Sequence, residues 1–481
     1  MFQKKFNSFI NLNDNIFFLV LTTLIFTIWF FLVGSELLNQ PFVWDDLHQV
    51  RVYSKDEILS TWVGHWDPDK VATPSYRPVA TLFYSLISSL FGESFVGIRL
   101  FISVLMILLI FSINILFLKL GLKKLEIIFF TILIIFSKIF VTLLSFIVLG
   151  AVIFSYMCAF FSINLFLKFL EKKNLNYYFL SIFLAFLSIF SREELYLLPC
   201  IIFLISLKKI EFNLSELKKN LYPILPFFFI VILHIVLRAK FVPEAGNFNF
   251  SNEGLFFNDK IVNFYKPVLA FVASWLPMGI DVTAFLTDGK YPFNTINFFF
   301  ILSWLSFLLL SVVSLGYKNI KKLIFKKKIL IFLLICLMTC APSLAYVRSF
   351  GIFLPSIFAL IIISIILGGL VKLTEIKKNN KFQSSIIFFV ICFTLLFGVV
   401  GGGHRSIQHI KGSNNFSAFL LQIDQSIVYH QLHQKTIPEE RVQKKLQHLQ
   451  SLNIYKFNTN INEYKNLSDK IKFPKYTIMD F

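Results

Sequence analysis

The sequence of 481 residues is 56% hydrophobic, has a mean hydropathy of +0.72 and contains 62 phenylalanines. This apolar content exceeds what the core of a soluble protein buries, and it indicates a polytopic membrane protein. The formal net charge of +19 at pH 7 would suggest a nucleic-acid partner if the chain were soluble. The lysines, however, form short runs between apolar stretches, as the positive-inside rule expects of cytoplasmic loops. Their distribution argues against nucleic acid as a partner.

Apolar stretches recur along the chain at lengths that suit membrane crossings. With about 20 residues per crossing, the sequence predicts an all-α fold with about 11 transmembrane helices. The spans are expected at residues 16–34, 95–118, 125–144, 147–167, 176–191, 194–207, 221–239, 295–316, 329–347, 350–371 and 384–402. The basic start, which no small-residue cleavage site follows, predicts a retained signal anchor. The amino terminus is then cytoplasmic and the carboxyl tail extracytoplasmic.

Two further apolar pieces are too short or too interrupted for a simple crossing. Residues 78–91 form a short stretch, and Pro267 and Pro277 break the stretch from 261 to 279. In the predicted topology both pieces lie on the outer side of the membrane. We therefore expect them to form interfacial or re-entrant helices.

The predicted topology divides the chain into two parts. Residues 1–402 form a transmembrane domain, with a first outer loop at 35–77 and a large outer loop at 240–294. Residues 403–481 form a small extracytoplasmic C-terminal region. This region is too short for an array of TPR repeats and shows no such period.

Several chemistries find no support in the sequence. All five cysteines fall in apolar segments, where buried thiols are expected rather than disulfides. The chain also has no Walker-type or Rossmann-type glycine pattern, no paired CxxC and no HExxH. These observations argue against an ATP-driven pump, a nicotinamide enzyme and a zinc hydrolase.

Acids and arginines gather at four outer turns of the predicted topology. They are Asp45 and Asp46 in "PFVWDDLHQV", Arg77 in "YRPV", Arg192 and Glu193 in "SREEL", Arg348 in "YVRSFGIFLPS", and His404 and Arg405 in "GGGHRS". Transfer of a sugar from a lipid-linked phosphate needs a base for the acceptor proton and cationic groups for the departing phosphate. A carboxylate can serve as the base, and the planar fork of arginine suits phosphate oxygens.

In their order and spacing these residues resemble the GT-C superfamily of membrane glycosyltransferases. The resemblance rests on "FVWDD" after the first span, on "YRPV", on an arginine and acid before "LYLLP", and on an arginine ahead of "LPS". It covers residues 15–405 and is closest to the protein O-mannosyltransferase and transmembrane-TPR mannosyltransferase branch and its bacterial relatives. It implies a polyprenyl-phosphate sugar as donor and leaves open whether the acceptor is a glycan, a lipid or a protein. Without a TPR array, a bacterial relative in the inner membrane is expected.

The resemblance also implies roles for individual residues. Asp45 and Asp46 match an acidic pair in the first outer loop that supplies the catalytic base, and Arg77 matches the arginine of an "RP" element. Arg192 with Glu193 matches a basic and acidic pair at a later outer turn. Arg348 matches the arginine before a proline. The implied reaction is a single inverting displacement in which the arginines neutralise the departing phosphate.

The same residues also have structural interpretations. Adjacent Asp45 and Asp46 suit a helix cap. Arg77 before Pro78 suits the anchoring of a helix start at the interface. Arg192 and Glu193, in turn, suit a mutual ion pair at a turn.

Alternatives remain open for the outermost residues and for the function as a whole. His404 and Arg405 suit interfacial snorkelling as well as phosphate binding. A divalent cation would also serve the phosphate chemistry, although the acids do not define a set of metal ligands. The competing functions are a multi-pass transporter or flippase of cell-envelope glycolipids and a non-catalytic membrane assembly protein. A transporter would be expected to show broken helices near the bilayer midplane.

Overall fold

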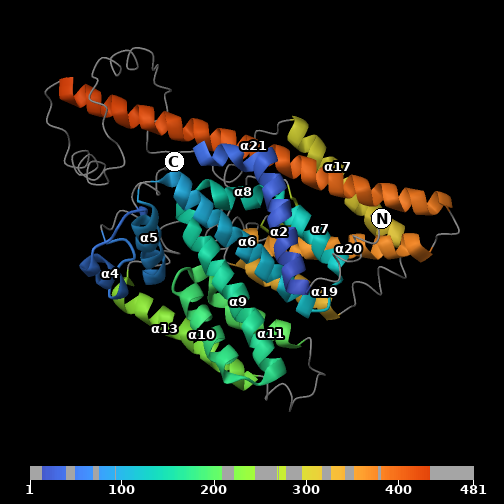
Figure 1. Ribbon diagram of the computed structural model, residues 1–481, viewed down its shortest axis with the longest axis horizontal. Helices are drawn as coiled ribbons and strands as arrows, with labels where there is room; N and C mark the ends of the chain where they lie inside the picture. Colours follow the sequence, from blue (N-terminus) through green and yellow to red (C-terminus); the bar gives the residue numbers. More distant parts are fainter. Residues whose placement is uncertain are drawn as a thin grey trace, which may run out of the picture.

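The computed structural model describes residues 13–39, 49–68, 75–92, 94–207, 221–243, 268, 270–277, 295–316, 327–341, 352–376 and 381–433. All regular elements in these residues are helices (Figure 1). The all-α class predicted from the sequence is therefore confirmed for this part of the chain. Together with the apolar character of the long helices, it makes the protein an integral membrane protein.

Seven helical segments in the described residues are long and apolar enough to cross a membrane. They contain α2 (Asp14–Trp29), α6 (Phe95–Lys119), α9 (Gly150–Lys172), α13 (Leu225–Phe241), α17 (Thr295–Leu315), α20 (Phe353–Ile376) and α21 (Lys381–His433). Other predicted spans correspond to shorter helices, namely α10 (Leu175–Ile189), α11 (Leu198–Ser206) and α19 (Lys327–Cys340). The prediction of 11 spans is thus not confirmed.

The span predicted at 125–144 is broken into two helices. α7 (Lys124–Ile135) and α8 (Lys138–Ser145) meet at a bend of 53°, and the pair counts as an eighth crossing if it is one span. The Ser137 side chain accepts a hydrogen bond from the Phe140 backbone N–H and so caps α8. The backbone N–H of Lys138 donates to the carbonyl of Pro277 at 2.8 Å. A distant segment therefore satisfies a backbone donor that the break releases.

The short stretch predicted at 78–91 is a helix with the same limits, α5 (Pro78–Phe91). Pro78 occupies its first turn, where a missing N–H costs nothing. The last helix, α21, continues without interruption from Lys381 through the predicted domain boundary at 402 to His433. Figure 1 shows α21 along one side of the molecule next to α17, while α4 (Lys55–Trp62), α5 and α13 lie on another side.

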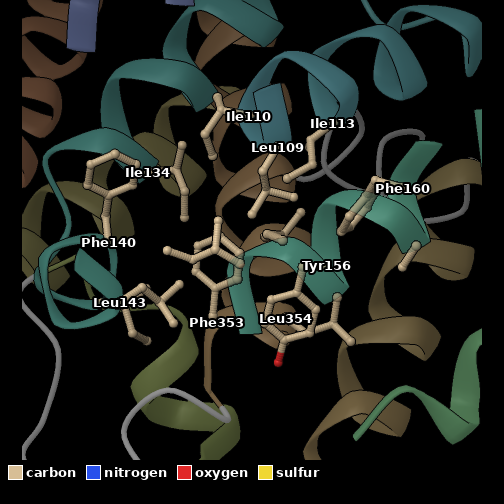
Figure 2. Packing of buried hydrophobic residues seen from close by; sticks show 14 of the residues in the cluster. Leu109, Ile110, Ile113, Ile134, Phe140, Leu143, Tyr156, Phe160, Phe353 and Leu354 are labelled. Carbon is tan, nitrogen blue, oxygen red and sulfur yellow. The ribbon is translucent and has the colours of Figure 1, made fainter. Parts of the chain in front are cut away.

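The helices pack around a core in which α9 contacts α6 and α10, and α20 contacts α7, α19 and α21. Figure 2 shows side chains of this core, among them Phe140, Tyr156 and Phe353. Since lipid is as apolar as the core, hydrogen bonds between helices help to specify which helices pack together. Buried Asn114 on α6 forms two such bonds: it donates to the Thr22 hydroxyl (3.0 Å) and accepts from the Thr131 hydroxyl (3.1 Å).

Candidate functional site

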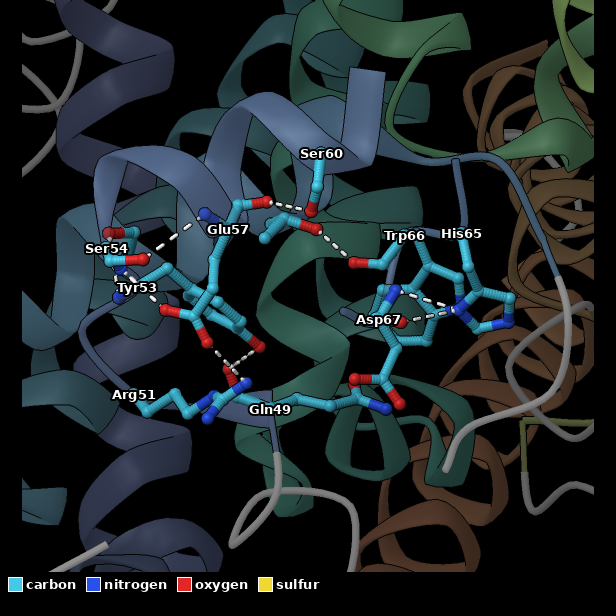
Figure 3. A network of polar contacts seen from close by, with 11 residues as sticks. Gln49, Arg51, Tyr53, Ser54, Glu57, Ser60, His65, Trp66 and Asp67 are labelled. Atoms are coloured by element: carbon cyan, nitrogen blue, oxygen red, sulfur yellow. Dashed lines mark hydrogen bonds and ion pairs between the residues drawn. The ribbon is translucent and has the colours of Figure 1, made fainter. Parts of the chain in front are cut away.

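The first predicted outer loop contains a short capped helix, α4. Ser54 accepts the Glu57 backbone N–H at 3.2 Å, and the Glu57 carboxylate accepts the Ser54 N–H at 2.7 Å (Figure 3). This reciprocal capping box satisfies donors that the helix start leaves open. Arg51 adds an ion pair of 3.1 Å to Glu57. These contacts fix the start of α4.

After α4, the chain is fixed against α5 by backbone contacts. The Trp66 N–H donates to the Ser75 carbonyl at 3.1 Å, and the Thr81 hydroxyl donates to the Trp66 carbonyl at 2.6 Å. The side chain of His65 is turned toward its own turn, where Nδ1 lies 3.0 Å from the Asp67 backbone nitrogen (Figure 3). The Arg77 guanidinium lies 5.7 Å from the centre of the Trp66 ring, within the range of a cation–π contact.

Arg77 is brought to the end of α10 by the start of α5. Arg77 is the N-cap residue of α5. The backbone N–H of Val79, two residues later, donates to the carbonyl of Phe190 at 3.3 Å. Phe190 is the C-cap of α10, and Arg192 follows it in extended conformation before the 3₁₀ turn η4 (Glu193–Leu197). One interhelical hydrogen bond thus holds two segments predicted to be functional next to each other.

The charged side chains at this junction form two crossed ion pairs. Nε of Arg77 lies 2.5 Å from Oε2 of Glu193, and Nη2 of Arg192 lies 3.2 Å from Oε1 of Glu194. All four side chains are at least three-quarters buried. Arg192 and Glu193 therefore do not form the mutual ion pair of the structural interpretation, because each pairs with another residue. Glu193 contacts an arginine from a different part of the chain.

A histidine that the sequence analysis did not single out ties both sides of this junction to α13. His234 is fully buried; its Nε2 donates to the Tyr76 carbonyl at 2.9 Å, and its Nδ1 lies 2.7 Å from the Tyr196 hydroxyl. Because a carbonyl oxygen can only accept, the neutral imidazole carries its hydrogen on Nε2, and the Tyr196 hydroxyl donates to Nδ1. Tyr76 precedes Arg77, and Tyr196 lies three residues after Glu193.

A third arginine acts on the same carboxylate. Burial would raise the pKa of Glu193, but the positive charges of Arg77, Arg238 and Arg192 outweigh it and hold that pKa below its ordinary value. Arg238 lies one helical turn after His234 on α13. Both fall within the predicted span at 221–239. An ionisable residue inside an apolar span is the signal that would have found them.

The structure brings together only some of the residues predicted from the sequence. Arg77, Arg192 and Glu193 form one group. His404 and Arg405 lie within α21 and contact Gln408 on the same helix, at 3.0 Å and 3.1 Å, and the His404 ring packs on Phe300 of α17. The predicted bases, Asp45 and Asp46, and the predicted phosphate ligand Arg348 lie outside the described residues, as does the greater part of the loop at 240–294.

The group has the chemistry of an anion site rather than of a cation site. Arg77 uses Nε for Glu193, while its two Nη groups make no hydrogen bond within the described part of the chain. Each described glutamate of the group is already paired with an arginine. The described residues contain no group of three or more histidines, cysteines or acids that fits a metal ion. Guanidinium groups at such a junction suit phosphate oxygens.

Comparison with known proteins gives a limited result. No protein-family model matches the chain, and no curated protein sequence matches it. Solved structures of the archaeal oligosaccharyltransferase AglB from Archaeoglobus fulgidus are similar in part. The complex with an inhibitory peptide and a dolichol-phosphate has 11% sequence identity and a TM-score of 0.43 over 81% of this chain. The form tethered to an acceptor peptide has 11% identity and a TM-score of 0.46 over 83%.

This chain spans 56% of the length of either of those structures. Because the sequence identity is 11% and both TM-scores are below 0.5, the function is inferred from the residues of the chain itself. The fold and the site together define an all-helical integral membrane protein. It carries a mostly buried arginine–glutamate group where α5, α10 and α13 meet.

Proposed function

We propose that this protein is a membrane glycosyltransferase of the GT-C type. It moves a sugar from a polyprenyl-phosphate-linked donor to an acceptor glycan, lipid or protein. The observation that supports this most is the convergence of Arg77, Arg192 and Arg238 at one end of the short apolar helix α5. A lipid phosphate carries its charge at the membrane interface, and guanidinium groups suit such a head group because their planar fork matches phosphate oxygens.

In the proposed reaction Asp45 or Asp46 takes the proton of an acceptor hydroxyl or amine. The freed electron pair attacks the anomeric carbon, and the bond from that carbon to the phosphate oxygen breaks on the opposite side. Polyprenyl phosphate leaves with the bonding electrons, and Arg77 and Arg192 stabilise its charge. One displacement inverts the configuration of the sugar carbon. Arg348 completes the phosphate ligands in this proposal.

The proposal places the reaction on the outer face of a bacterial inner membrane. The amino terminus is then cytoplasmic, and residues 403–481 form an extracytoplasmic region. His404 and Arg405 are proposed to contact the donor phosphate from the start of this region. Membrane lipids are the other partner of the chain.

The role of the arginines is tested by binding of undecaprenyl phosphate to the purified full-length protein in lipid nanodiscs. Arg77→Gln and Arg192→Gln should each weaken binding by about ten- to a hundredfold, since a charge-assisted hydrogen bond contributes roughly 1.5–3 kcal/mol. Arg51→Gln is the matched control, because Arg51 pairs with Glu57 on α4. Equal affinity of all four proteins would exclude the group as a phosphate site.

A flippase or transporter of envelope glycolipids is the second candidate, and the break between α7 and α8 favours it. Transporters use discontinuous helices to form their binding sites. The two functions are separated by the fate of a donor labelled in its sugar. A glycosyltransferase releases sugar-free polyprenyl phosphate, whereas a flippase moves the intact lipid between the leaflets of a vesicle.

A further inference from the structure

In the part of the chain that the structure describes, Glu193 and Glu194 each leave one carboxylate oxygen without a partner. Oε2 of Glu193 pairs with Arg77 and Oε1 of Glu194 pairs with Arg192. The other two oxygens, Oε1 of Glu193 and Oε2 of Glu194, are buried and accept no hydrogen bond from any described residue. A buried acceptor without a partner costs roughly 1–3 kcal/mol, and more if it is charged. Two such oxygens on consecutive residues therefore call for a donor that the described residues do not supply.

A buried histidine is linked to the same junction through Trp66. The side chain of His65 is 7% exposed, and its Nδ1 lies 2.9 Å from the Asp67 carbonyl oxygen and 3.0 Å from the Asp67 backbone nitrogen. Its buried Nε2 has no hydrogen-bond partner among the residues that the structure describes. The His65 ring stacks on Trp66 at 6.5 Å, and Trp66 in turn contacts the Arg77 guanidinium.

The charge of the junction decides which donors suit the glutamates. Arg77, Arg192 and Arg238 already supply three positive charges to two carboxylates, so a further cation would be repelled. Neutral hydroxyl groups face no such repulsion and form strong hydrogen bonds with a carboxylate. Hydroxyl groups suit His65 as well, because a hydroxyl can both donate to and accept from Nε2 of an imidazole.

We propose that Glu193 Oε1 and Glu194 Oε2 form a subsite for the hydroxyl groups of a sugar, next to the position of the lipid phosphate. Nε2 of His65 forms a hydrogen bond with a hydroxyl of the same head group. This subsite rests on the proposed function, because it assigns the sugar of the donor. It makes the junction selective for a glycosylated lipid phosphate over the sugar-free lipid.

The test compares undecaprenyl phosphate with undecaprenyl phosphate carrying glucose, mannose or galactose. Binding to the full-length protein in nanodiscs is measured for the wild type and for Glu194→Gln. The wild type should bind at least one of the glycosylated lipids about tenfold more tightly than the sugar-free lipid. Glu194→Gln should lose most of this preference and keep its affinity for the sugar-free lipid. Exposed Glu375, on α20, supplies the control Glu375→Gln.

The outcomes separate this subsite from the proposed function. A wild type that binds none of the four lipids contradicts both. A wild type that binds all four with equal affinity contradicts the sugar subsite alone, without reference to any variant. If Glu194→Gln weakens all four lipids by the same factor, Glu194 only positions Arg192 and the subsite is rejected. A folding defect in the variant is recognised by gel filtration, and Glu193→Gln then takes its place in the comparison.

Discussion

The Nε atom of Arg77 lies 2.5 Å from Oε2 of Glu193, although 116 positions separate the two residues in the sequence. Glu193 does not pair with the arginine beside it, because Arg192 turns toward Glu194. The contact joins the segment before α5 to the turn after α10. The site therefore exists only when these two parts of the chain are folded against each other.

A double-mutant cycle measures this contact. Arg77→Gln leaves the carboxylate of Glu193 mostly buried without its nearest charge, and Glu193→Gln does the same to the guanidinium. Each change should lower the free energy of unfolding by about 2 kcal/mol, between the values of exposed and buried pairs. The double variant should be more stable than the sum of the two losses predicts. Strictly additive losses, measured by denaturation in detergent, would show that the two side chains do not interact.

Acidification should weaken the same contact. Burial would raise the pKa of Glu193, but its arginine neighbours hold that pKa below the ordinary value. The stabilisation is then complete above the ordinary glutamate pKa of about 4.3 and is lost as the pH falls through the lower pKa of the folded state. Between pH 7 and about 3, the midpoint temperature of thermal unfolding should fall further for the wild type than for Glu193→Gln. Parallel curves for the two proteins would contradict the lowered pKa.

His234 should be more important for stability than its place in an apolar helix suggests. His234→Phe keeps the ring but removes both hydrogen bonds, and it leaves the Tyr76 carbonyl and the Tyr196 hydroxyl buried without this partner. We expect a loss of about 2–3 kcal/mol, and about 1 kcal/mol for Tyr196→Phe. Tyr222, which is 70% exposed, provides the control Tyr222→Phe. A loss for His234→Phe no larger than that of the control would exclude the bridge.

Two adjacent glycines of α21 should differ in their tolerance of alanine. A Cβ atom at Gly402 would clash with the carbonyl oxygen of Phe136, at the break between α7 and α8, whereas one at Gly403 meets nothing closer than 3.8 Å. Gly402→Ala should cost about 1–3 kcal/mol through overpacking against backbone that cannot move aside. Gly403→Ala should be neutral or stabilising, because alanine favours the helix. Equal melting temperatures for the two variants would contradict the close approach of α21.

Local features of the fold could be predicted from the sequence because they depend on local composition. The apolar stretches predicted α6, α9 and α17 with limits close to those observed, and the Arg77–Pro78 step predicted the start of α5. The break after Ile135 could not be predicted in this way. Its donor at Lys138 is satisfied by Pro277, a contact between segments far apart in the chain.

The residues of the site, like the helices, could be predicted from the sequence only in part. Arg77, Arg192 and Glu193 were identified from the sequence as polar residues at predicted turns. Their pairing depends on the approach of α5 to α10, which no local pattern encodes. His234 and Arg238 were missed because their helix reads as an apolar span, although two ionisable residues one turn apart are themselves a signal in such a helix.

Sugar transfer is tested most directly by turnover of the donor. Purified protein in detergent is incubated with a panel of polyprenyl-phosphate sugars and candidate acceptors, and the release of polyprenyl phosphate is measured for the wild type, Asp45→Asn and Asp46→Asn. We predict release by the wild type, and one asparagine variant that binds donor but does not turn over. Consumption of no donor, or equal turnover by all three proteins, would contradict the account and favour a flippase or an assembly protein.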